Sequence, residues 1–214
     1  MNGLTLFTHL NTAPPVHRKV DFEQLMGRAA WQRLVPAIRE RFANDHYTNT
    51  TVNYRGVMLV VRCNTAGWLL AQVCRLIGTP LTPYTGIDVA TTVRVYEDNT
   101  AGGTVWEREY QFKNHKPLVV RSVKCLDTDE TLLESVDGGI RMRLRVFEEK
   151  GKLVFISKDY FIKLAGLRFT IPMWLTPGTT RVEHVDEGSG WFRFILSMDH
   201  PWLGEMFYQE GVFK

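Results

Sequence analysis

Cysteine is scarce in this sequence, and its spacing argues against two common structural frameworks. The 214 residues include three cysteines, Cys63, Cys74 and Cys125. An odd number without paired spacing argues against a disulfide framework, and no C-x-x-C pattern marks a zinc site. The histidines at 46, 115, 184 and 200 are scattered without ligand spacing. We therefore expect reduced, mostly buried thiols, no metal and no cofactor.

Long apolar runs and a strong charge of either sign are also missing. No apolar run approaches the roughly 20 residues that cross a bilayer, and MNGLTLFTHLNTAPPVHRK lacks the charged start of a signal peptide. The net charge is only +3. Lys and Arg are spread along the chain instead of clustering, which argues against nucleic-acid binding. We expect a cytoplasmic protein with no transmembrane segment.

The beginning of the chain divides into a leader and helical segments. Residues 1–20, which include Pro14-Pro15, are expected to form an extended leader, and residues 21–214 a single α+β domain. Asp21 is a candidate N-cap for a helix in which apolar residues recur at helical spacing up to Ala29. Pro36 suits the first turn of a second helix that ends at Phe42.

A third helix is predicted over residues 66–77, with Asn64 or Thr65 as its cap. Its apolar stripe is expected to lie across the end of a sheet; the residues are Leu69, Leu70, Val73, Leu76 and Ile77. A helix that lies on a membrane surface is the alternative interpretation. That alternative calls for more basic residues than Arg75 alone.

The rest of the chain has the period of two that is typical of strands. Short β-branched and apolar segments follow one another, joined by turns rich in Gly, Asp and Asn. The predicted strands are 51–63, 89–96, 104–112, 118–126, 131–136, 139–147, 153–161, 180–185, 190–198 and 205–213. We therefore expect an α+β fold that is mostly β: a curved antiparallel sheet or barrel of about ten strands with N-terminal helices packed on it.

Side-chain alternation assigns the faces of these strands. Arg141, Arg143 and Arg145 share one face of their strand, which is most simply a solvated outer face, with an anion- or nucleic-acid-binding stripe as the alternative. In the strand 104–112, Arg108 lies on the inward face instead. The inward residues of that strand are Trp106, Arg108, Tyr110 and Phe112.

An inward arginine needs a partner, because burial of an unpaired guanidinium costs several kcal/mol. Glu134 has the same parity as Leu132 and Val136, and Ser122 shares a face with Val120. One interpretation is a buried ion pair between Arg108 and Glu134, with Ser122 nearby. The other is a polar anchor at the bottom of an apolar pocket.

Several segments together resemble an uncharacterised bacterial family, a domain of unknown function, from about Val35 onward. Its marks are Trp106 and Arg108, with Tyr110, in the W-x-R-x-F-like strand, then Ser122, Glu134, the LxGLxxxIPxWLxP segment (164–177) and Leu203-Gly204 followed by Tyr208. The family occurs alone or fused to saccharopine-dehydrogenase-like NAD(P)-binding or DoxX-like modules. The resemblance implies an NAD(P)-binding protein as a possible partner, and it brings no catalytic residues.

The expected function is binding of a small hydrophobic ligand with a polar or acidic head inside the β-structure. The predicted ligand-binding residues are Arg108, Glu134, Trp106, Tyr110, Ser122 and Tyr208. Whether the chain is an enzyme stays open, because the sequence has no P-loop, GxSxG or HExxH pattern. The alternatives are an enzyme that uses Glu134 or His200 as acid or base, and an interaction module that acts through the segment 169–175.

Overall fold

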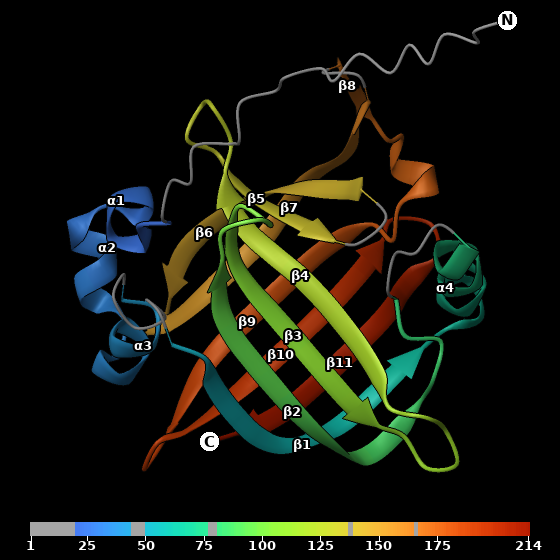
Figure 1. The fold of residues 1–214 in the computed structure, drawn as a ribbon, viewed down its shortest axis with the longest axis horizontal. Helices are drawn as coiled ribbons and strands as arrows, with labels where there is room; N and C mark the ends of the chain where they lie inside the picture. The colour runs from blue at the N-terminus through green and yellow to red at the C-terminus, as the bar shows by residue number, and fades with distance from the viewer. Residues whose placement is uncertain (1–19, 44–49, 77–80, 137–138, 165–166) are drawn as a thin grey trace, which may run out of the picture.

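The structure is a computed structural model, and it describes residues 20–43, 50–76, 81–136, 139–164 and 167–214. The predicted leader therefore lies outside the described residues except for Val20. Figure 1 shows a β-barrel that carries short helices on two opposite sides.

The described residues form eleven strands of one antiparallel sheet, and ten of these close into a barrel. The barrel follows the order β6-β5-β4-β3-β2-β1-β11-β10-β9-β7, and β7 pairs with β6 to complete the ring. Its strands are β1 (Val52–Cys63), β2 (Gly86–Asp98), β3 (Gly103–Gln111), β4 (Leu118–Leu126), β5 (Leu132–Val136), β6 (Ile140–Glu149), β7 (Lys152–Leu164), β9 (Thr179–Gly188), β10 (Trp191–His200) and β11 (Gly204–Phe213). The predicted antiparallel structure of about ten strands is confirmed, and of the two forms left open, curved sheet or barrel, it is a closed barrel.

The ring closes where the first strand meets the last. Gly56 lies opposite Phe213 in the β1–β11 ladder, and a Cβ atom on Gly56 would come within 1.9 Å of the Val212 carbonyl oxygen. Only glycine fits such a close approach of two backbones. The short strand β8 (Leu167–Thr170), which the sequence did not predict, pairs with the end of β7.

Three short helices close one end of the barrel, at the left of Figure 1. They are α1 (Phe22–Met26), α2 (Arg28–Arg33) and α3 (Pro36–Arg41). Asp21 caps α1 as predicted, since its carboxylate accepts a hydrogen bond from the backbone N–H of Gln24. Gly27, with a φ of +81°, splits the single helix that the spacing predicted into α1 and α2. The ring of Phe42 stacks on Trp106 inside the barrel, 5.7 Å between centroids.

Helix α4 (Thr65–Leu76) lies at the other end of the barrel. Asn64 caps it as predicted, because its side-chain oxygen accepts a hydrogen bond from the Gly67 N–H. The predicted buried stripe is wrong for most of its members. The helix buries Gly67, Ala71 and Cys74 and exposes Leu69, Val73 and Leu76; Leu70 is half-buried, and Ile77 lies outside the described residues.

The small residues of α4 explain this inversion. A Cβ atom on Gly67 would come within 2.3 Å of the Met206 carbonyl oxygen. The helix therefore approaches β11 so closely that only its small side chains fit between them, and its large side chains point away. No helix among the described residues is long and apolar enough to cross a membrane.

The three arginines of β6 point outward as predicted, but only one of them is as exposed as expected. Arg145 is exposed, whereas Arg141 and Arg143 are half-buried. The Nε of Arg143 donates to a carboxylate oxygen of Asp159 at 2.8 Å. The middle arginine of the row is therefore ion-paired on the outer face of the barrel.

Candidate functional site

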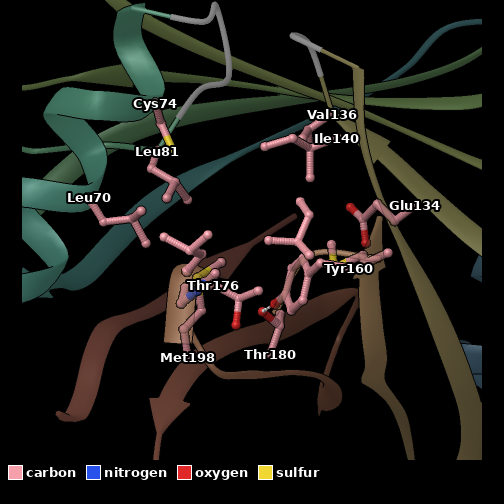
Figure 2. Close-up of a pocket in the computed structure, with 14 residues that line it drawn as sticks. Leu70, Cys74, Leu81, Glu134, Val136, Ile140, Tyr160, Thr176, Thr180 and Met198 are labelled. Atoms are coloured by element: carbon pink, nitrogen blue, oxygen red, sulfur yellow. Dashed lines mark hydrogen bonds between the residues drawn. The ribbon is translucent and has the colours of Figure 1, made fainter. Parts of the chain in front are cut away.

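Two adjoining cavities lie between α4 and the interior of the barrel. We call the first the mouth cavity; its lining includes Leu70, Cys74, Ile140, Tyr160, Leu175 and Met198. Figure 2 shows Leu70 and Cys74 of α4 on one side of this cavity and Glu134 and Tyr160 on the other. The cavity reaches the surface at Leu175, in the short helix η2 (Met173–Leu175), where that side chain is exposed.

The second cavity, which we call the lumen cavity, lies inside the barrel. Its lining includes Trp106, Arg108, Tyr110, Lys124, His184 and Gln209. The two cavities adjoin, because Glu134, Met142, Thr180 and Met198 line both. Each cavity has a volume of about 80 Å³, which is room for several waters or a narrow chain of atoms. The pair therefore forms an apolar entrance followed by a polar interior.

Three charged side chains meet in the lumen from neighbouring strands. Lys124 on β4 lies directly opposite Glu134 on β5 in the ladder, and its Nζ is 3.2 Å from the Glu134 carboxylate. Arg108 projects from β3. The first of the two interpretations, an ion pair between Arg108 and Glu134, is thus corrected: the ion-pair partner of Glu134 among the described residues is Lys124, because strand register places it opposite.

The electrostatics of this group favour an ionised Glu134. Burial raises the pKa of the Glu134 carboxyl, but the positive charges of Lys124 and Arg108 more than offset that effect, so the pKa lies below its ordinary value. Burial lowers the pKa of Lys124, and the charge of Arg108 lowers it further, while Glu134 opposes both effects. Ser122 lies beside Glu134 and helps to hold its pKa down, although no described residue accepts or donates a well-formed hydrogen bond at its hydroxyl.

Arg108 contributes a charge that the described residues leave without a hydrogen bond. Its Nε is buried and has no hydrogen-bond partner in the described ranges. The guanidinium carbon lies 5.8 Å from the centre of the Phe194 ring, which is near the outer limit of a cation–π contact. The lumen therefore holds two cations and one anion from β3, β4 and β5.

Trp106 and Tyr110 both line the lumen cavity, on either side of Arg108 along β3. The Tyr110 hydroxyl donates to the side-chain oxygen of Gln209 at 2.8 Å. Trp106 lies 5.2 Å from the Lys124 Nζ. The inward face predicted for Trp106, Arg108 and Tyr110 is confirmed by these contacts.

Lys124 and His184 also line the lumen cavity, although neither was among the predicted ligand-binding residues. Lys124 continues the alternation of Val120 and Ser122, so its parity was sufficient to place it inside. His184 lies on the same face of β9 as Val182 and is buried among aromatic rings. Its ring centroid is 4.9 Å from that of Phe42. Burial holds the pKa of His184 well below its ordinary value, and the charge of Arg41 acts in the same direction.

Tyr208 and His200 lie apart from the lumen. Tyr208 is on the opposite face of β11 from the lumen-lining Gln209, and its hydroxyl donates to Glu210 at 2.7 Å. His200 is buried at the end of β10, where its Nδ1 accepts a hydrogen bond from the Trp202 N–H at 3.3 Å. The structure thus brings together five of the six predicted ligand-binding residues, since Ser122 borders Glu134, and it places Tyr208 outside.

The fold and the two cavities define a closed antiparallel β-barrel with a charged lumen and an apolar mouth. The chain belongs to the family described as a domain of unknown function, DUF4166, whose model matches residues 34–213. This confirms the family resemblance that the sequence showed. The fusion partners that the resemblance implies stay a prediction.

The comparisons also find a similar bacterial protein of unknown role. An uncharacterized protein of Bacillus subtilis (strain 168), YndH, is 29% identical over 117 residues, which is 52% of this chain and 56% of YndH. The chain thus matches about half the length of that curated relative. No solved structure matches the chain.

Proposed function

We propose that the barrel binds a small amphiphile, with its anionic head group beside Arg108 in the lumen and its apolar part in the mouth cavity. The observation that carries this proposal is the buried Nε of Arg108, which has no hydrogen-bond partner among the described residues. A guanidinium in such a position favours a carboxylate, since the two planar groups can form paired hydrogen bonds.

The charge balance of the lumen supports an anion there. Lys124 is already paired with Glu134, so the positive charge of Arg108 is the one in excess. Of the predicted ligand residues, Trp106 and Tyr110 line the lumen cavity beside Arg108, and Lys124, His184 and Gln209 line it too. The Nδ1 of His184 is also buried without a hydrogen-bond partner in the described part of the chain, so it offers a second polar contact to the head group.

The apolar mouth supports the second half of the proposal. Its lining is mostly aliphatic and aromatic, and burial of apolar surface is the main favourable contribution to binding of a hydrocarbon chain. Because the lumen and the mouth adjoin at Glu134, Thr180 and Met198, one ligand can occupy both.

An enzyme in this pocket receives less support. The pKa of Glu134 lies below its ordinary value, whereas a carboxyl acting as general acid near neutral pH needs a raised one. His200 is not part of the lining of either cavity. A cytoplasmic location stays a prediction that accompanies the proposal.

Calorimetric titration with decanoate and with decanol tests the proposal. We expect the wild-type protein to bind decanoate more tightly than decanol. Arg108→Met should weaken decanoate binding by about 10–100-fold, the loss expected for one charge-assisted contact, and should leave decanol binding nearly unchanged. The matched control is Arg145→Met, which changes an exposed arginine on the outside of β6 and should alter neither affinity.

The Arg108→Met variant also separates a binding role from a structural one. Removal of a charge that has no hydrogen-bond partner should leave the melting temperature of the ligand-free protein equal or higher. Failure of decanoate to bind the wild-type protein, or equal decanoate affinity in Arg108→Met, would refute the proposal.

A further inference from the structure

Helix α4 presents large apolar side chains to solvent. Leu69 is 60% exposed and Leu76 is 86% exposed, whereas Gly67, Ala71 and Cys74 are buried against the barrel. At helical spacing, Leu69, Val73 and Leu76 fall on the face opposite the buried one, and the exposed Trp68 lies at the border between the two faces. The helix is therefore apolar on both faces, a pattern that is typical of helices covered on both sides.

Two other segments extend this surface at the same end of the barrel. Trp202, in the turn between β10 and β11, is 75% exposed, and Trp174 in η2 is 61% exposed. The Asn64 side-chain amide donates to the Leu203 carbonyl oxygen at 2.9 Å, so the turn lies at the start of α4. Gly178, just beyond η2, packs against the backbone of Asp199 beside the same turn.

We define the apolar rim as Trp68, Leu69, Leu76, Trp174, Leu175 and Trp202. The rim is continuous with the mouth cavity, because α4 and the segment around η2 also provide part of its lining through Leu70, Cys74 and Leu175. Whatever covers the rim therefore also faces the entrance of the cavity.

We propose that the apolar rim docks on the surface of a lipid bilayer and that the ligand enters the mouth cavity from that bilayer. The docking step is inferred from the exposed side chains of the rim alone, while the entry step rests on the proposed function. Tryptophan and leucine side chains projecting together suit the boundary between head groups and acyl chains, where the indole N–H stays hydrated and the ring is buried.

Charge contributes little attraction between the rim and a phospholipid surface. In the sequence, Arg75 is the sole charged residue between Asn64 and Tyr84, and Arg168, the sole one between Leu164 and Arg181, is ion-paired with Asp159 at 3.4 Å. Neither segment carries a carboxylate that would repel lipid phosphates. At the strand ends that flank the turn between β10 and β11, Asp199 is exposed, while Glu205 is ion-paired with Arg62 at 2.8 Å. Anionic lipid should therefore strengthen docking only modestly, with apolar insertion as the main contribution.

Flotation with vesicles tests this inference. We expect the full chain to float with phosphatidylcholine vesicles and somewhat better when phosphatidylglycerol is included. The double variant Leu69→Ser/Leu76→Ser should lower partitioning by about tenfold or more, because two exposed leucines no longer insert. Trp191→Ser is the matched control: Trp191 is exposed at the opposite end of β10, and its change should leave flotation intact.

Three results would overturn docking: no flotation of the wild-type chain, equal flotation of the Leu69→Ser/Leu76→Ser variant, or a stable dimer that this variant converts to monomer without any vesicle binding. The last result would assign the rim to a second copy of the chain.

Docking and ligand binding are distinguished by measuring both flotation and decanoate affinity for each of the two variants. Leu69→Ser/Leu76→Ser should keep its affinity for decanoate added from solution and lose flotation, whereas Arg108→Met should float normally and lose decanoate binding. Loss of both properties in either variant would contradict the separation of rim and lumen.

Discussion

The pair Lys124–Glu134 provides a test of the charge arrangement in the lumen. The two side chains are 9% and 8% exposed and lie 3.2 Å apart, so the energetics of buried ion pairs apply instead of those of surface pairs. Glu134 is the sole described anion of the group, and both Lys124 and Arg108 lower its pKa. Removal of the anion should therefore harm the fold more than removal of either cation.

The expected magnitudes follow from which charges remain. Glu134→Leu leaves Lys124 and Arg108 facing each other, and we expect a loss of about 3–5 kcal/mol in unfolding free energy. Lys124→Met leaves Glu134 with Arg108, so we expect about half that loss. The double variant retains one cation, as Arg108 alone, and should be more stable than Glu134→Leu.

Urea unfolding followed by tryptophan fluorescence, near neutral pH, measures these differences. The exposed pair of Arg62 and Glu205, 2.8 Å apart, is the control. The corresponding substitutions there, Arg62→Met and Glu205→Leu, should show a coupling energy of about 1 kcal/mol or less.

The pH dependence of the Glu134→Leu variant adds a second measurement. The pKa of Lys124 in the folded state is lowered by burial, and loss of Glu134 removes the effect that opposed this. A folded-state pKa below the unfolded value, about 10.4, means that stability rises with pH as the lysine deprotonates. Glu134→Leu should therefore recover part of its loss as the pH rises. A double variant less stable than Glu134→Leu, or Lys124→Met as damaging as Glu134→Leu, would refute this account of the lumen.

Three further predictions concern the rest of the barrel. His184 is buried with a lowered pKa, so the fold should lose about 1.4 kcal/mol per pH unit below about pH 6.5 while the folded histidine stays neutral; His184→Phe should flatten this slope in thermal melts. Gly56→Ala should destabilise the fold by about 3 kcal/mol, since its Cβ meets the Val212 carbonyl oxygen, and an unchanged urea midpoint would contradict this. Truncation after Leu203 removes β11 and should leave insoluble protein, because the edges of β1 and β10 lose their partner; a monodisperse truncated chain in gel filtration would disprove it.

Much of the barrel could be predicted because alternation and turn composition are local properties. The ten strands of the barrel were predicted within a few residues of their observed bounds, β8 was not predicted, and alternation alone turned Arg108 inward. Alternation gave no position for Tyr208, which was predicted as a ligand residue from the family resemblance, because β11 buries apolar side chains on both faces: Phe207 faces the lumen and Met206 lies near α4. When both faces are apolar, alternation no longer distinguishes inside from outside.

The remaining errors arose from distances that the sequence does not encode locally. The partner of Glu134 depends on the register of β4 against β5, which sets Lys124 opposite it. The orientation of α4 depends on how closely it approaches β11, and this made Gly67 and Ala71 the buried face in place of Leu69 and Val73. Hydrophobic periodicity identifies the large side chains of a helix, but it cannot tell when small ones make the contact.

The pairing of β1 with β11 determines when this protein can fold during its synthesis. Arg55 and Lys214 exchange two backbone hydrogen bonds, of 2.9 and 3.0 Å, across a long separation in the chain. While the ribosome is still making β11, the edge of β1 has no partner, and the nascent chain must hold an open sheet with its lumen charges in water. Ring closure must therefore wait for the last strand, and the long loop that it closes carries a high entropic cost.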